Sequence, residues 1–297
     1  MAKRSRFGWP WGRKAESGAA AAASPDESRW VEVRGLKLHY RVVGRPGGTP
    51  LVMLHGLLGH AREWDPAVAE LAVAHEVWVL DQRGHGLSDW AGDYSRSTMA
   101  DDLVAWLEAV GLERPVVIGH SMGATVALLA AARRPGLFGR LVIADTAPKT
   151  ADGELQSWLR EYLEELGTSS YGTISEAFAL RSGGPRARPE LARRSVEQSL
   201  VRGDDGRYRW CFDAQGLVGS LDSVDPSVLW EAIDAISCPV LLLRGEHSLE
   251  LSAELAEEMA RRLGDARLGT ITGAGHDLAL ENPEGVARAV LDYLSEG

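Results

Sequence analysis

A glycine-flanked serine between a strand and a helix is the feature that most restricts how this chain can fold. Residues 116–118 form an apolar, β-branched run, and residues 122–134 form an alanine-rich, helical pattern. The backbone must therefore turn from strand to helix at Ser121, which strains that residue. Side chains at the flanking positions would clash, and Gly119 and Gly123 avoid this. The pattern predicts that Ser121 projects from the end of a sheet, beside the amino terminus of a helix.

Buried strands alternate with helices on both sides of this corner. From residue 51 to 148, apolar runs typical of strands covered on both faces alternate with helical patterns, which indicates a parallel sheet between two helical layers. The alternation stops at 149–235, where several amphipathic helices are expected, and then resumes. We therefore predict a doubly wound, mostly parallel α/β core formed by 29–148 and 236–297, with 149–235 inserted as a helical cap.

Composition excludes several classes of partner. The 297-residue chain has a net charge of −10, which argues against nucleic acid as a partner. It contains no apolar run of about 18 residues, so we expect no membrane span. Residues 1–28 are basic and then rich in alanine and serine, too weakly apolar for a signal peptide, and we predict a disordered tail. Two cysteines make no disulfide framework, and a cytoplasmic location fits.

Six short motifs resemble those of the α/β-hydrolase superfamily, and they occur together, in order, at the ends of predicted strands. The resemblance covers roughly residues 30–295 and implies the α/β-hydrolase fold with a helical cap. It also implies that Ser121 is the nucleophile and that His276, which comes last in the chain, is its base, because a serine hydroxyl is nearly inert without one. The motifs are HGLLG (55–59), DQRGHGLSD (81–89), GHSMG (119–123), DTAP (145–148), LLLRGEHS (241–248) and GAGHDLALENPE (273–284).

The resemblance also implies where the oxyanion and the substrate would lie. The backbone N–H groups of Leu57 and Met122 are expected to form the oxyanion hole. Together with Leu58, these side chains would give an apolar floor, which favours a substrate with an apolar acyl part. His120, in the corner, and Trp210, in the cap, are candidate substrate contacts. We find no metal-ligand spacing and expect no metal or other cofactor.

The acid that should orient His276 is missing from its usual place in the family. That place is three or four residues after Gly245, where this chain has Ser248 and Leu249. We assign this role first to Asp145, at the end of the strand before the insertion, which keeps the order serine, acid, histidine.

Two further alternatives remain for this acid. Glu250 or Glu246 could reach His276 from the loop after Gly245, or there is no acid and Ser248 or water holds the ring. Loss of the acid typically costs about 10⁴ in rate. A chain without it could have abandoned hydrolysis.

The expected function is cofactor-free serine hydrolysis of a small or medium carboxylic ester, lactone or thioester. The doubtful acid favours a first alternative, a non-hydrolytic pocket that binds a ligand or catalyses cyclisation or elimination. A carbon–carbon bond hydrolase would use the same site residues and is a second alternative. The sequence leaves the substrate's identity and the oligomeric state open.

Overall fold

The computed structural model describes residues 24–149, 153–181, 184–221 and 224–296. Most of the expected tail, residues 1–23, lies outside these ranges. No helix in the described part of the chain has both the length and the apolar character needed to cross a membrane.

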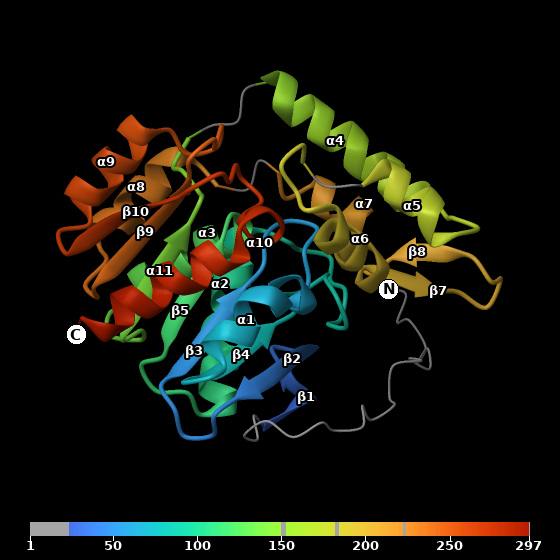
Figure 1. Cartoon of the computed structure of the whole chain (residues 1–297). Helices are drawn as coiled ribbons and strands as arrows, with labels where there is room; N and C mark the ends of the chain where they lie inside the picture. Colours follow the sequence, from blue (N-terminus) through green and yellow to red (C-terminus); the bar gives the residue numbers. More distant parts are fainter. Residues whose placement is uncertain (1–23, 150–152, 182–183, 222–223, 297) are drawn as a thin grey trace.

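An eight-stranded sheet forms the centre of the molecule, in the order β1-β2-β4-β3-β5-β6-β9-β10 (Figure 1). The strand β2 pairs antiparallel with both of its neighbours, and the other pairs are parallel. This confirms the predicted α/β fold class. The strands are β1 (Ser24–Val33), β2 (Leu36–Gly44), β3 (Pro50–Leu54), β4 (Glu76–Leu80), β5 (Val116–His120), β6 (Arg140–Ala144), β9 (Val240–Gly245) and β10 (Ala266–Ile271).

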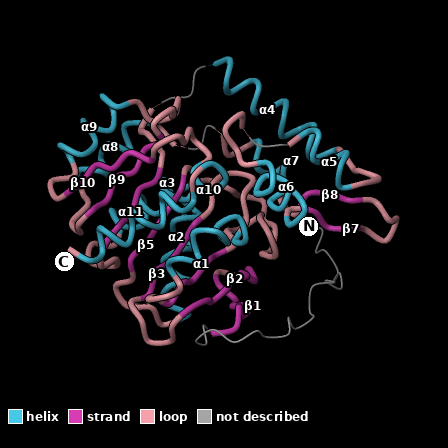
Figure 2. The backbone as a smooth tube through the Cα atoms, in the orientation of Figure 1, coloured by secondary structure: helices cyan, strands magenta, loops and turns pink. Residues whose placement is uncertain are grey.

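Helices cover both faces of this sheet, as Figure 2 shows. Alternate residues of β3 serve the two faces: Val52 and Leu54 join the apolar cluster beneath α2 and α3, whereas Leu51 and Met53 join the cluster beneath α1 and α11. Alternation of this kind is what makes a central strand apolar throughout. The core helices are η1 (Ala61–Trp64), α1 (Asp65–Leu71), α2 (Arg96–Val110), α3 (Met122–Arg133), α8 (Pro226–Asp234), α9 (Ala253–Arg262), α10 (Leu278–Glu281) and α11 (Pro283–Ser295).

The cap lies over the carboxyl ends of the strands and packs around its own apolar cluster (Figure 1). The insertion is not wholly helical, because it contains the short antiparallel hairpin β7–β8. Moreover, α8 falls within the range expected for the cap but packs against α3 and α9 of the core. The cap elements are α4 (Gly153–Thr168), α5 (Ile174–Leu180), α6 (Pro189–Gln198), β7 (Leu200–Arg202), β8 (Tyr208–Trp210) and α7 (Ala214–Val218).

The first strand begins at Ser24, inside the range that the sequence assigned to the tail. The buried Arg41 of β2 accounts for this extension, since its guanidinium donates to both carboxylate oxygens of Asp26, at 2.9 and 2.7 Å. Arg41 also donates to Asp65 at 2.6 Å. A buried cation of this kind needs carboxylate partners, and one of them comes from the residues just before the predicted strand.

Candidate active site

Ser121 occupies the corner between β5 and α3. Its backbone angles are φ 50° and ψ −116°, a sparsely populated conformation that is costly for a residue with a Cβ. A Cβ on Gly119 would lie 2.5 Å from the carbonyl oxygen of Gly123, and one on Gly123 would lie 2.7 Å from that of His55. Both glycines are therefore required by close backbone packing, and Ser121 lies at the end of the sheet as predicted.

His276 reaches Ser121 from the loop between β10 and α10. Its Nε2 lies 3.1 Å from the Ser121 Oγ, and its Nδ1 lies 2.7 Å from Oδ2 of Asp145. A carboxylate only accepts hydrogen bonds, so Nδ1 carries the proton and donates it to Asp145. In the neutral ring, Nε2 is then free to accept the proton of the Ser121 hydroxyl.

Asp145 is fully buried at the end of β6, with φ 49°. Its Oδ1 accepts a hydrogen bond from the Gly245 backbone N–H at 2.8 Å, and its Oδ2 accepts one from the Ser248 hydroxyl at 2.6 Å. The Ser248 Oγ in turn accepts the N–H groups of Glu250 and Leu251, both at 3.1 Å, so its proton is directed to Asp145. The carboxylate is thereby fixed in one orientation towards His276.

The other two candidate acids point elsewhere. Glu250 forms an ion pair with Lys149 at 3.4 Å. Glu246 accepts the Gly273 backbone N–H at 2.7 Å. Ser248 binds Asp145 rather than the histidine. Of the three alternatives raised by the sequence, the geometry favours Asp145.

The electrostatics of the site favour a basic His276. Desolvation by the surrounding protein would lower the pKa of His276, although its side chain is 43% exposed, but the hydrogen bond and negative charge of Asp145 outweigh it and raise the pKa above its ordinary value of 6.5. The neighbouring His120 differs: burial, together with the charge of His276, lowers its pKa to about 4. Neutral His120 donates from Nε2 to the His276 carbonyl at 2.7 Å. It is 6% exposed, and its contacts hold the His276 loop rather than line a pocket.

The loop that follows β3 lies directly against Ser121. A Cβ on Gly56 would lie 3.1 Å from His120 Nδ1 and 3.4 Å from the Ser121 Cβ, so only glycine fits comfortably there. Leu58 has φ 64°, a strained value that fixes the path of the loop. Met122 is the first residue of α3, so its N–H has no partner within the helix and is available to an anion.

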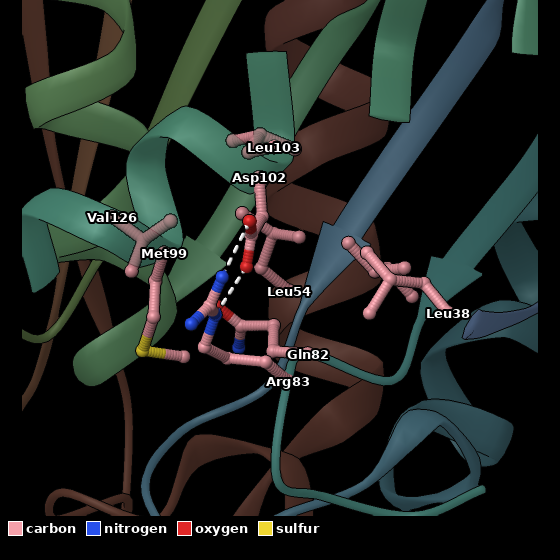
Figure 3. A pocket seen from close by; sticks show the side chains of 9 residues that line it. Leu38, Leu54, Gln82, Arg83, Met99, Asp102, Leu103 and Val126 are labelled. Atoms are coloured by element: carbon pink, nitrogen blue, oxygen red, sulfur yellow. Dashed lines mark hydrogen bonds and ion pairs between the residues drawn. The ribbon is translucent and has the colours of Figure 1, made fainter. Parts of the chain in front are cut away.

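The buried carboxylate of Asp81 anchors the segment that follows this loop. It accepts the Ala61 N–H at 2.6 Å, the His39 Nδ1 at 2.7 Å and the Leu87 N–H at 3.0 Å. Arg83, which belongs to the same DQRGHGLSD motif, does not pair with Asp81. Arg83 instead pairs through two hydrogen bonds with Asp102 of α2, beside an apolar void of about 10 Å³ (Figure 3).

Trp210, expected as a substrate contact, is 3% exposed and donates from Nε1 to the Tyr171 hydroxyl at 3.0 Å. The Arg181 guanidinium lies 5.5 Å from the centroid of its ring. Leu57 and Leu58 pack into the same cap cluster as Trp210, so this part of the predicted apolar floor faces the cap. Met122 belongs instead to the cluster beneath α2 and α3. Arg181 could not be identified from the sequence, because a lone arginine at the end of a helix carries no recognisable pattern.

Comparisons with known proteins show the family to which the chain is similar. A family model described as alpha/beta hydrolase fold matches residues 49–283. The esterase YbfF of Escherichia coli (strain K12) is 29% identical over 249 residues, covering 84% of this chain and 94% of the relative. The 2-(acetamidomethylene)succinate hydrolase of Mesorhizobium japonicum is 26% identical over 268 residues, covering 90% of this chain and 95% of the relative.

A solved structure is similar over the same extent. The crystal structure of an E-2-(acetamidomethylene)succinate hydrolase superimposes with a TM-score of 0.82 at 25% identity, covering 91% of this chain and 99% of the other. The relatives are enzymes named as esterases and hydrolases. The chain therefore belongs to the alpha/beta hydrolase family, as an enzyme of the kind that its esterase and hydrolase relatives represent.

Proposed function

We propose that this protein is a serine hydrolase that cleaves a small or medium carboxylic ester, lactone or thioester. The observation that carries the proposal is the continuous chain of hydrogen bonds from Ser121 through His276 to the buried Asp145. A serine hydroxyl held by an imidazole, which is oriented by a carboxylate, is the arrangement that activates serine for attack on a carbonyl. The esterase relatives support this reaction class.

The reaction would proceed in two halves. Ser121 Oγ attacks the carbonyl carbon while His276 Nε2 takes its proton, and the tetrahedral oxyanion is held by the Leu57 and Met122 N–H groups. His276 then returns the proton to the leaving alcohol, thiol or ring oxygen, which leaves an acyl-enzyme. Water attacks this ester, with His276 again as the base, and the carboxylic acid is released. Asp145 stays ionised throughout and stabilises the protonated imidazole.

The acyl part of the substrate would lie against Leu57, which is partly exposed, whereas the buried Leu58 and Met122 would only pack behind it. All three side chains are apolar, and Leu57 and Leu58 belong to the cluster shared with the cap. An apolar chain in this position would be buried between the loop and the cap.

The alternative of a non-hydrolytic pocket was favoured by the absence of an acid at its usual position. The contacts of Asp145 weaken that argument.

The proposal can be tested with a fluorophosphonate probe, which labels activated serines. We expect the protein to be labelled and the Ser121→Ala variant not to be. On p-nitrophenyl esters, Asp145→Asn should lower kcat by about 10⁴, whereas Glu250→Gln should change it less than about threefold, since a half-exposed ion pair contributes little. An unlabelled protein, or an Asp145→Asn variant as active as the original, would refute the proposal.

A further inference from the structure

Arg181 is a half-buried cation in the cap that forms no ion pair with a carboxylate in the described part of the chain. It follows α5 directly, and its guanidinium lies 5.5 Å from the ring centroid of Trp210 and 5.7 Å from that of Phe212. Its one hydrogen bond goes from Nη1 to the Ser199 hydroxyl at 3.4 Å. Within the described residues, no Asp or Glu oxygen lies within ion-pair distance of it, whereas many other arginines of the chain have such a partner.

The aromatic pair beneath Arg181 connects it to the candidate active site. Trp210 and Phe212 are stacked, with ring centroids 5.6 Å apart. Both belong to the cap cluster that contains Leu58 and contacts Leu57, the two residues after Gly56 in the expected oxyanion loop. The Phe212 ring also lies 6.5 Å from His85, whose ring is 4.9 Å from that of His55. Arg181 is therefore held where the cap meets the loop beside Ser121.

The positive charge of Arg181 affects the pKa of titratable groups on both loops that border the site. Burial is the main cause that lowers the pKa of His55, and it also lowers the pKa of His60 to about 4. In each case the positive charge of Arg181 lowers the pKa further. Burial raises the pKa of Glu63 to about 8 and also raises that of Asp277, and Arg181 opposes both changes. Asp277 directly follows His276.

None of these neighbours forms an ion pair with Arg181. The imidazoles cannot form one, and Glu63 keeps its proton over most of the neutral range because its pKa is about 8. Neither Glu63 nor Asp277 is in ion-pair contact with the guanidinium. A guanidinium that is stacked on aromatic rings, and is only partly desolvated, keeps its fork of N–H donors available for a planar anion.

We propose that Arg181 binds a carboxylate carried by the substrate, so that the preferred substrate is an ester or thioester whose acyl chain ends in a carboxylate. This inference rests on the proposed function. The apolar part of such a chain would lie along Leu57, and its terminal carboxylate would meet the Arg181 fork in a bidentate pair. Half-esters of short dicarboxylic acids have this chemistry.

The test compares two esters of similar length. One is mono-p-nitrophenyl glutarate, whose acyl chain ends in a carboxylate, and the other is p-nitrophenyl valerate, whose acyl chain is neutral. The readout is the ratio of their kcat/KM values. We expect the protein to prefer the anionic ester, and Arg181→Gln to lower the ratio by about 50-fold. Arg181→Lys should recover part of it, because the charge is kept and the fork is lost.

The matched control is Arg193→Gln, which removes an exposed cap arginine that pairs with Glu197 at 3.0 Å. This variant should leave the ratio unchanged. A protein that hydrolyses the neutral ester without preferring the anionic one would overturn the role of Arg181 while leaving the proposed function intact. An equal loss on both esters in Arg181→Gln would indicate a structural role and would also overturn it.

A binding measurement covers a protein that hydrolyses neither ester, an outcome that would contradict the proposed function. Calorimetric titration with glutarate should then still show binding to the unmodified protein, weakened about 10-fold or more in Arg181→Gln and unchanged in Arg193→Gln. Equal affinity of the Arg181 variant and the unmodified protein for glutarate would overturn the carboxylate site.

Discussion

At the scale of single residues, the central feature is the polarisation of His276 by Asp145. A catalytic base must be neutral to accept a proton, and the carboxylate at 2.7 Å favours the charged ring. The pKa of His276 is consequently raised above 6.5. The base is strengthened, but it is available only at higher pH.

We therefore expect kcat/KM to rise with pH through an apparent pKa above 6.5, with activity lost at acidic pH. In Asp145→Asn the largest raising influence disappears, while the smaller influences of Glu250 and Asp277 remain, so the pKa of His276 should fall. The measurement is a pH profile of kcat/KM on a p-nitrophenyl ester, together with NMR titration of the histidine ring, identified through His276→Gln. Glu250→Gln is the control, because the charge of Glu250 raises the pKa of His276 less than Asp145 does. An identical NMR titration in Asp145→Asn and the original protein would contradict this account.

The sequence could nominate these residues but could not choose among the acids. Ser121 and His276 are identifiable because local constraints mark them: glycines at a sharp corner, and a glycine-rich loop after a strand. Asp145 and Glu250 each follow a strand with similar local patterns. The choice depends on which carboxylate packs beside the ring in three dimensions, and on Ser248, whose hydroxyl fixes Asp145 from 103 positions away.

At the scale of elements, the corner between β5 and α3 depends on how closely α3 approaches β3. A Cβ on Gly123 would lie 2.7 Å from the carbonyl oxygens of both Leu54 and His55. These are backbone atoms at the end of a central strand, so they cannot move without disturbing the sheet. The contact also sets the distance between Ser121 and the expected oxyanion loop.

Gly123→Ala should accordingly lower the free energy of unfolding by about 2–3 kcal/mol, as overpacking of a tight core does. The matched control is Gly92→Ala, at an exposed glycine with no atom within 4 Å of the added Cβ, where the change should stay within about 0.5 kcal/mol. Urea unfolding measures both. Equal stability of the two variants would show that α3 can shift away from β3 without cost.

Most elements could be predicted because each one carries its own signal. The amphipathic and apolar patterns predicted the core strands and helices. The asparagine before the last helix caps it, since Asn282 accepts the Gly285 N–H at 2.8 Å. The differences occur where tertiary partners decide. The strand β1 begins before Trp30 because Asp26 pairs with Arg41. The helix α8 joins the core because it packs against α3.

At the scale of the whole molecule, cap and core are joined by specific polar contacts. The Tyr94 hydroxyl, on the core side, donates to Asp213 Oδ2 at the start of α7 at 2.7 Å, and the Asp213 N–H donates to the Gly84 carbonyl at 2.8 Å. Further along this interface, Glu63 of η1 lines a void of about 10 Å³ together with α6 residues including Leu191 and Ser195. Residues of the cap thus lie beside the carboxyl group of Glu63, which is 8% exposed.

This burial predicts a pH-dependent stability. Burial, reinforced by the charge of Asp277, raises the pKa of Glu63 from 4.5 to about 8. Between these values the folded protein holds a proton that the unfolded chain releases, so stability should fall as pH rises, by up to about 1.4 kcal/mol per pH unit. Glu63→Gln removes this proton uptake and should flatten the pH dependence of the free energy of unfolding, measured by urea unfolding at pH 5.5, 7.0 and 8.5.

The raised pKa of His276 adds a slope of the same sign to both proteins, so its contribution cancels when the variant is compared with the original protein. Glu70→Gln, on α1, should follow the original protein; a Glu63→Gln curve parallel to both would mean that the fold does not desolvate this carboxyl group.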